Sequence, residues 1–386
     1  MNLVSWRRGR RQDQEFFDFL EFVDDITSIH VEFQASVPRI RLWDRQNPAN
    51  TMRDVDFARD HGLSKFAFCR ILDLIQGQLD SKQETKITVP ASQKLSAFLR
   101  FLRSGSLHRC VAGNKDIQLS QSMTCRIINK VANVIAEMQS KYVKFPDQSE
   151  QYEIANALSA ECGFPPVVCG IVDGTHIEIQ KPISKNPAPE RFFNRKGYYS
   201  LNMMCVVDHV GKIRHFTCRH AGSAHDAKIF GESSLRAQLL ADFDTERPLA
   251  LLGDEGYGAE DVMLPPVRVQ QMASAPPAMR QKILAYNKIH KKTRIKVEHA
   301  FGVLKKRFPV LLYIIRSTKL ANIQAIVSSA IVIHNLLIDL KEHNLSTLQS
   351  ERDYHEELSS FDLDQQLSSH VGEKFRLRNT IINTFF

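Results

Sequence analysis

Apolar residues recur at helical spacing through most of the segment from residue 54 to residue 140. The segment GLSKFAFCRILDLIQGQL predicts a helix that begins after Ser64 as its N-cap, with an apolar stripe made of Phe66, Ile71, Leu74, Ile75 and Leu79. The segment LSQSMTCRIINKVANVIAEM predicts another helix after Ser120, with a stripe made of Met123, Ile127, Val131, Val134 and Met138. The pattern therefore predicts an all-helical region over residues 51–145, preceded by an N-terminal extension over residues 1–50.

Part of this region has the outline of a helix-turn-helix. Residues 108–131, HRCVAGNKDIQLSQSMTCRIINKV, read as a helix, a short turn and a second helix. In such a pair the second helix can enter the major groove of DNA, and here it would present Gln121, Ser122, Thr124 and Arg126. The alternative is a plain helical bundle that packs on the rest of the protein, and the sequence leaves both open.

From Pro165 onward the periodicity becomes that of strands. PVVCGIVDGTHIEI predicts one strand, and YYSLNMMCVVDHVGKIRHFTCRHAG predicts two more, joined by a turn at His209–Gly211. HDAKIFGESSLRAQLL predicts a helix, and RPLALLGDEGYG a short buried strand that ends at Gly253. A loop is expected over residues 264–277. It is followed by a long helix or a helix pair from Met279 to Phe308 and an apolar helix over residues 320–340.

Strand, two hairpin strands, helix, strand and helices in this order predict an α/β fold. Its sheet is mixed, with helices on its faces, and the order matches a ribonuclease-H-like core over residues 160–342. A polar tail, expected to lack regular structure in part, follows over residues 343–386.

Composition narrows the functional classes only slightly. The net charge is +8 and the pI about 9.1, which favours a polyanionic partner but does not require one. Seven scattered cysteines without a CxxC pair argue against a disulfide framework and a structural zinc site, and favour a reducing compartment. The most apolar segment, residues 326–340, is interrupted by Ser328, Ser329, His334 and Asn335, so a buried helix is expected rather than a membrane span.

Three acidic residues stand at positions suited to metal-dependent phosphoryl transfer. Asp173 lies in the first predicted strand and Asp254 directly follows a buried strand, while Glu298 lies in the long helix. Carboxylates from two strands and a helix can converge at one sheet edge and bind Mg²⁺ or Mn²⁺. Two such ions would hold the attacking and leaving oxygens of a phosphodiester. Structural alternatives are a turn at Asp173-Gly174, a loop cap at Asp254 and a surface ion pair between Glu298 and Arg294.

Basic residues surround Glu298. Between Tyr286 and Phe308 it is the only acid among eight Lys and Arg, and the three expected to meet DNA phosphates are Lys291, Arg294 and Lys305. Arg195 and Lys196, which precede two tyrosines, are further candidates for DNA contacts, with an ordinary hairpin edge as the alternative. His220, His225 and Asp226 could bind zinc, but their spacing matches no established zinc pattern, and Asp226 as a helix N-cap explains them equally well.

Six segments together resemble the PIF/Harbinger transposases and the Harbinger transposase-derived nucleases. They are IVDGTHIEI, FNRKGYYSLNMMCVVD, GSAHDAKIF, LLGDEGY, YNKIHKKTRIKVEHAFGVLKKRF and IVIHNLL, and they occur in family order. The family often has proline after GY and before GS, where this chain has Gly258 and Ala221. These departures affect loops and leave the acids intact.

The resemblance implies a ribonuclease-H-like fold and divalent-metal nuclease chemistry on DNA. It assigns catalysis and metal binding to Asp173, Asp254 and Glu298. It also implies action in the nucleus, with the cytoplasm as a second location, and a Myb-like partner protein that supplies specific DNA binding. The basic residues Arg7, Arg8, Arg10 and Arg11 are a candidate nuclear localisation signal. The competing hypothesis is a domesticated DNA- or chromatin-binding protein that keeps the fold without cleaving. The sequence leaves the oligomeric state open.

Overall fold

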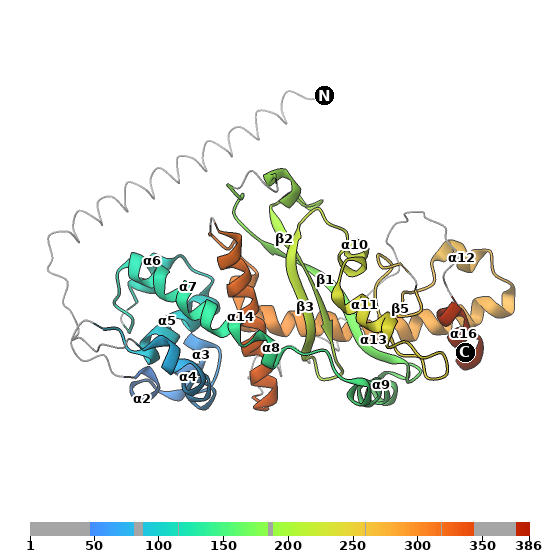
Figure 1. Ribbon diagram of the computed structural model, residues 1–386, viewed down its shortest axis with the longest axis horizontal. Helices are drawn as coiled ribbons and strands as arrows, with labels where there is room; N and C mark the ends of the chain where they lie inside the picture. Colours follow the sequence, from blue (N-terminus) through green and yellow to red (C-terminus); the bar gives the residue numbers. More distant parts are fainter. Residues whose placement is uncertain are drawn as a thin grey trace, which may run out of the picture. The chain divides into compact units, whose positions relative to one another are not determined.

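The computed structural model describes residues 47–80, 88–114, 116–183, 188–258, 260–317, 319–342 and 376–386 (Figure 1). Residues 45–386 form one compact unit. The basic cluster at residues 7–11 and most of the predicted extension and polar tail lie outside the described residues. The boundaries predicted for the helical region and the catalytic domain stay predictions, because one hydrophobic core continues from the helices into the sheet.

The region before the sheet is helical, as predicted. Its helices are α2 (Pro48–Thr51), α3 (Asp54–His61), α4 (Lys65–Leu79), α5 (Ala91–Ser104), α6 (His108–Ala112), α7 (Gln121–Glu137), α8 (Gln139–Tyr142) and α9 (Gln148–Cys162). Both predicted caps are confirmed: the Ser64 hydroxyl accepts from the Ala67 amide at 3.1 Å, and the Ser120 hydroxyl from the Met123 amide at 3.2 Å. Helix α9 was not predicted from the sequence.

The predicted apolar stripes are correct only in part. In α4, Phe66 and Leu74 are 64% and 40% exposed, because α5 and α7 pack on the face that carries Phe68 and Ile71. In α7, Met123 is 39% exposed, whereas its neighbour Thr124 is buried. Periodicity identified both helices but misplaced the edge of each buried face.

Helices α6 and α7 differ from the helix-turn-helix that the sequence predicted. Helix α6 is a single turn of five residues, and the connection to α7 spans residues 113–120, whereas such motifs use a turn of three or four residues. Thr124 cannot meet DNA, because its side chain is buried and its hydroxyl donates to the Ser120 carbonyl at 3.0 Å. Gln121, Ser122 and Arg126 are exposed. Most of α7 packs on α5 and α14, which is the arrangement of a helical bundle.

The sheet has five strands in the order β3-β2-β1-β4-β5. The strands are β1 (Val168–Glu178), β2 (Ser200–Val207), β3 (Ile213–Ala221), β4 (Ala250–Leu252) and β5 (Met263–Leu264). Strands β1, β2 and β3 are antiparallel neighbours, whereas β4 is parallel to β1 and β5 is parallel to β4. The turn between β2 and β3 contains Gly211 at φ 83°, within the predicted turn. This mixed sheet with flanking helices confirms the predicted α/β, ribonuclease-H-like class.

Helices cover both faces of the sheet. The core on one face joins Ile171 and Cys205 to helices α13 (Pro277–Arg307) and α14 (Leu320–Asp339). The core on the other face joins Val172 and Met204 to α10 (Asp226–Gly231) and α11 (Ser234–Ala241). Because neighbouring strand residues point to opposite faces, Asp173 faces α13 and Gly174 faces α10.

Helix α14 is the apolar helix predicted at the C-terminal end of the domain. By length and composition it could cross a membrane, yet 78% of its apolar window is buried, which is the environment of a core helix. It contacts both α7 and β3 (Figure 1). Asn335 interrupts its apolar sequence because its amide donates to the Ile213 and Tyr142 carbonyls, at 2.7 and 2.9 Å.

Two predictions about the second half were wrong in detail, and the predicted polar tail left one helix unassigned. The helix expected after β3 is broken into α10 and α11, because Ser233 caps the second one. The stretch expected to be loop contains β5 and the short helix α12 (Val269–Ala273). The polar tail contains helix α16 (Arg376–Phe385), which packs on α13 and buries Leu377, Ile381 and Ile382. The remaining elements are the 3-10 helices η1 (Pro189–Phe192) and η2 (Pro309–Leu311).

Candidate active site

Asp173 and Asp254 lie level with each other on neighbouring strands. Ile171 of β1 pairs with Leu252 of β4, so each aspartate comes two residues after the same pair. Asp173 itself pairs with Cys205 of β2, which rules out the alternative of a turn at this position. Asp254 has left the strand, and its carboxylate accepts from the Gly256 amide at 2.9 Å. The loop cap that the sequence offered as an alternative is therefore present, and this hydrogen bond holds the Asp254 carboxylate at the end of β4.

Glu298 reaches the same position from α13. The helix packs Val297, Ala300 and Leu304 on the sheet, and Glu298 lies beside this buried face with a side chain that is 49% exposed. Arg294, one turn earlier, forms ion pairs with Glu298 and with Asp173, the latter at 3.1 Å. The predicted alternative of a Glu298–Arg294 ion pair is thus present, and the same arginine links Glu298 to the aspartate on β1.

Negative charge on Asp173 and on Asp254 is unfavourable, because burial raises the pKa of both carboxyl groups. Burial raises the pKa of Asp173 to about 6, the Arg294 charge opposes this, and the charges of Asp254 and Glu298 add to it. Burial likewise raises the pKa of Asp254, again against Arg294, and the charge of Asp226 adds to that increase. Carboxylates gathered in a poorly solvated site are stabilised by a cation.

The donor set fits a hard divalent cation. All three acids offer oxygen ligands, which Mg²⁺ and Mn²⁺ prefer. The buried hydroxyl of Tyr257, whose pKa is raised by burial and by the charges of Asp226, Asp173 and Asp254, has no hydrogen-bond partner among the described residues. Among the described residues, no three His, Cys, Asp or Glu side chains are already close enough together to hold a metal ion, so the acids would have to turn toward a cation to bind it. The guanidinium of Arg294 lies between two of the acids.

The predicted DNA-binding residues fall into two groups. Lys305 is on the same side of α13 as Arg294 and Glu298, and its amine donates to the Thr175 hydroxyl at 2.7 Å, two residues along β1 from Asp173. Arg195 and Lys196 are exposed in the turn before β2. The pKa of His176 is lowered by burial and then by the charges of Lys196, Arg195 and Lys305, so these three cations surround one point of β1.

Lys291 is exposed one turn before Arg294 on α13. Lys291, Arg294 and Lys305 thus follow one another along α13, and Lys305 shares an influence on His176 with the Arg195–Lys196 turn; these five cations are called the basic surface below.

The zinc candidates His220, His225 and Asp226 do not form a group of metal ligands among the described residues. His220 lies in β3, opposite Asn202 of β2. The N-cap of α10 is His225, whereas Asp226 is the first helical residue, so the N-cap prediction for Asp226 was wrong. Its carboxylate instead accepts from the Asn202 amide at 2.8 Å and lies against Gly174. The sequence signal for this neighbour of the acids was the glycine after Asp173, which leaves room for a close approach.

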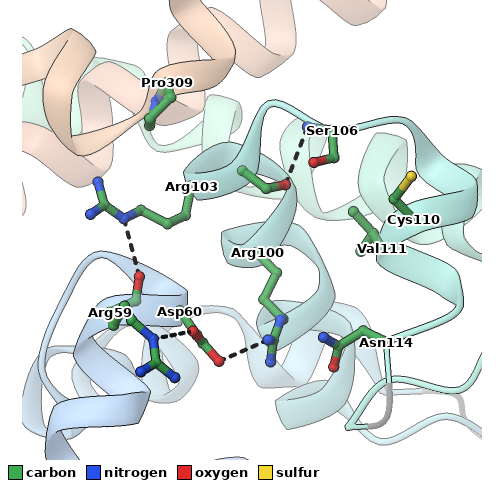
Figure 2. A pocket seen from close by; sticks show the side chains of 10 residues that line it. Arg59, Asp60, Arg100, Arg103, Ser106, Cys110, Val111, Asn114 and Pro309 are labelled. Carbon is green, nitrogen blue, oxygen red and sulfur yellow. Dashed lines mark hydrogen bonds and ion pairs between the residues drawn. The ribbon is translucent and has the colours of Figure 1, made fainter.

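A cavity of about 500 Å³ lies away from the acids, between α3, α5, α6 and Pro309 (Figure 2). Figure 2 shows Arg59 and Arg100 directed at Asp60, to which they are hydrogen-bonded at 3.1 and 2.8 Å. Arg103 donates to the carbonyls of Arg59 and Lys306. These arginines are paired with Asp60 or bonded to backbone carbonyls. Their contacts connect the helical region to the end of α13, and the cavity is therefore a poorer candidate for catalysis than the site of the three acids.

Comparisons with known proteins agree with this geometry. Residues 172–335 match the family described as DDE superfamily endonuclease. The chain is 27% identical over 263 residues to "Putative nuclease HARBI1" of Homo sapiens, covering 66% of this chain and 70% of that protein. The protein of the same name from Rattus norvegicus is 25% identical over 341 residues, covering 86% and 92%. No solved structure matches the chain.

The matched segment contains the acids and extends from β1 through α13 into α14. A nuclease-type function is supported for this chain by the domain and by the names of these relatives. The similarity of residues 172–335 to the DDE superfamily endonucleases, together with these relatives, supports the Harbinger transposase-derived nuclease family to which the sequence motifs point.

Proposed function

We propose that this protein is a divalent-metal-dependent DNA endonuclease that cleaves phosphodiester bonds by a two-metal mechanism. The observation that carries the proposal is that Asp173 and Asp254 lie level with each other on neighbouring strands, while Arg294 links Asp173 to Glu298 of α13. Such a group of carboxylates is unstable without a cation, which is the property required of a metal site. The cofactor is Mg²⁺ or Mn²⁺.

In this proposal the three acids hold the metal ions. The bound ions would supply an acidified water or 3′-hydroxyl and stabilise the charge on the leaving oxygen. Arg294 holds Asp173 and Glu298 together through its two ion pairs, and if these acids held a divalent cation, the guanidinium would be freed from at least one of them. Once released, its guanidinium can bind a phosphate of the substrate.

The basic surface would hold the nucleic acid beside the acids. Lys305 and the Arg195–Lys196 turn lie on the side of Asp173 toward His176, while Lys291 continues the surface along α13. Phosphate contacts of this kind position a strand without reading its sequence. A separate Myb-like protein would then supply sequence recognition, and the protein would act in the nucleus, with the cytoplasm as a second location.

Plasmid nicking tests the proposal. The wild-type protein is compared with Asp254→Asn and Glu298→Gln in Mg²⁺ or Mn²⁺, and EDTA serves as the control for metal dependence. Cleavage that requires metal and is lost in both folded variants is the expected result. A matched control is Glu255→Gln, which removes the neighbouring carboxylate that pairs with Arg268.

Wild-type rates in Glu298→Gln would contradict the assignment of that residue. Metal-independent DNA binding without cleavage, by wild-type protein that binds no metal, would favour the domesticated binding protein. Microscopy of the tagged full-length chain tests the location.

A further inference from the structure

A tyrosine ring lies near the acids, on the turn that leads into β2. Tyr198 precedes the start of this strand by two positions, and its ring meets that of His176 edge-on, with centroids 6.3 Å apart and planes at 82°. His176 comes three residues after Asp173 on β1, which corresponds to about 10 Å along an extended strand. Tyr198 is therefore within reach of a nucleotide that lies close to the proposed cleavage position.

One buried side chain holds the turn that carries Tyr198. The Asn194 carboxamide oxygen accepts from the backbone amides of Lys196 and Tyr198, at 2.9 and 3.4 Å. Its amide group donates to the Ser200 hydroxyl at 2.8 Å, and the same hydroxyl lies 3.0 Å from Nδ1 of His176. Asn194 is 3% exposed, so water competes little for these hydrogen bonds. The network fixes Tyr198 relative to His176 before any ligand binds.

The two adjacent tyrosines differ in what covers their rings. Tyr199 packs against the hydrophobic core, its ring centroid lies 5.2 Å from that of Phe193, and Lys181 Nζ lies 5.8 Å from it. Across the described ranges, Tyr198 makes its ring contact with His176, and an edge-on contact leaves at least one face of the tyrosine uncovered by that neighbour. The Tyr198 side chain is also partly exposed. It thus offers an aromatic face to a ligand.

Three cations of the basic surface lie around this ring. Arg195 and Lys196 are exposed in the same turn, and Lys305 approaches β1 from α13. Burial lowers the pKa of His176, and the charges of these three cations lower it further, so all three lie near the ring that Tyr198 contacts.

An aromatic face beside several cations is suited to an unpaired nucleotide. The cations bind phosphates of the strand, and the ring stacks on a base, as in proteins that bind single-stranded nucleic acid. A base inside a duplex already has both faces covered by its neighbours, so a ring of this kind selects a base that has left the stack.

We propose that Tyr198 stacks on a base that has left the duplex beside the cleaved bond, so that the substrate of this site is DNA that is locally unpaired there. The inference rests on the proposed DNA endonuclease function and adds a preference for unpaired DNA. Asn194 is then a positioning residue, which holds the turn so that the Tyr198 ring is presented to the base.

DNA binding by the full-length protein tests the proposal without reference to cleavage. In EDTA, fluorescence anisotropy compares a fully paired duplex with the same duplex carrying a short unpaired stretch at its centre. Tyr198→Leu should bind the unpaired DNA about tenfold more weakly than the wild type, and the paired duplex equally well, because it loses the stacking of one base. Tyr198→Phe keeps the ring and should bind both DNAs like the wild type. The matched control is Tyr313→Leu, because that tyrosine is 55% exposed and lies against Gly105, outside this turn.

A 2-aminopurine base in the unpaired stretch reports stacking directly, since its fluorescence falls when it stacks on a ring. We expect binding of the wild type to lower this fluorescence and binding of Tyr198→Leu to leave it unchanged. Fluorescence that does not fall with saturating wild-type protein would overturn the proposal. This measurement decides even if circular dichroism shows that Tyr198→Leu does not fold.

Folded Tyr198→Leu that binds the unpaired DNA like the wild type would overturn the proposal and leave the proposed endonuclease function standing. An equal loss of binding to both DNAs would do the same, because the ring would then not distinguish an unpaired base. Folded wild-type protein that binds neither DNA would instead overturn the proposed function, and the inference with it.

Discussion

Asp173→Asn is expected to stabilise the metal-free protein at neutral pH, although it removes a residue assigned to catalysis. The pKa of Asp173 is raised from 3.8 to about 6, with burial as the main cause. Its ionised form is therefore less stable in the folded chain than in the unfolded chain. Asparagine has nearly the same shape, keeps an oxygen that can accept from the Gly174 amide, and carries no charge.

The magnitude follows from the pKa difference. A difference of about two pH units corresponds to about 3 kcal/mol. Since the folded state binds the proton more tightly, this contribution to stability is complete below pH 3.8 and is lost as the pH rises to about 6. Loss of the ion pair with Arg294 offsets part of the gain, so Asp173→Asn should exceed the wild type by about 1–3 kcal/mol at pH 7.5.

Urea denaturation in EDTA at pH 4, 5, 6 and 7.5 measures the effect, and the difference between the two proteins isolates Asp173 from the other titrating groups. Added Mn²⁺ should reverse the order, because a ligand at 100 times its Kd stabilises the wild type by about 2.7 kcal/mol and the variant cannot bind it. This metal effect should weaken below about pH 6, where protons compete for Asp173. If Asp173→Asn is less stable than the wild type in EDTA at pH 7.5, or if the difference between them does not change with pH, the account of this site is refuted.

Two further predictions concern the basic surface and the core. Lys305→Gln should weaken DNA binding and reduce the slope of log K against log salt by about 0.9, the value for one phosphate contact. Fluorescence anisotropy at several salt concentrations measures this slope. The control is Lys292→Gln, whose amine bonds to α9, and an equal loss of binding in that variant would contradict the assignment. Asn335→Ala should cost about 3 kcal/mol in urea denaturation, because Ile213 and Tyr142 lose buried hydrogen-bond partners. The exposed Asn133→Ala serves as its control, and equal stabilities of the two variants would show that the Asn335 contacts contribute little.

Most helices and strands could be assigned from local sequence patterns. The Ser64 and Ser120 caps could be predicted because a cap is formed with residues two or three positions away. The turn at Gly211 could be predicted for the same reason, because it depends on neighbouring residues. Helix α16 and strand β5 were missed, since their apolar residues are few and gain stability only from α13 and β4.

The sequence by itself determined the order of the elements, the class of the fold and the three acids, because each is encoded in neighbouring residues or in short motifs. Only the tertiary structure decided which side chains meet. Arg294 reaches Asp173 across a strand-helix interface, and Asp226 reaches Gly174 from a helix that follows β3. Thr124, predicted to face DNA, is buried in the folded chain. These contacts depend on how amphipathic faces pack against one another, and periodicity specifies a face without specifying its partner.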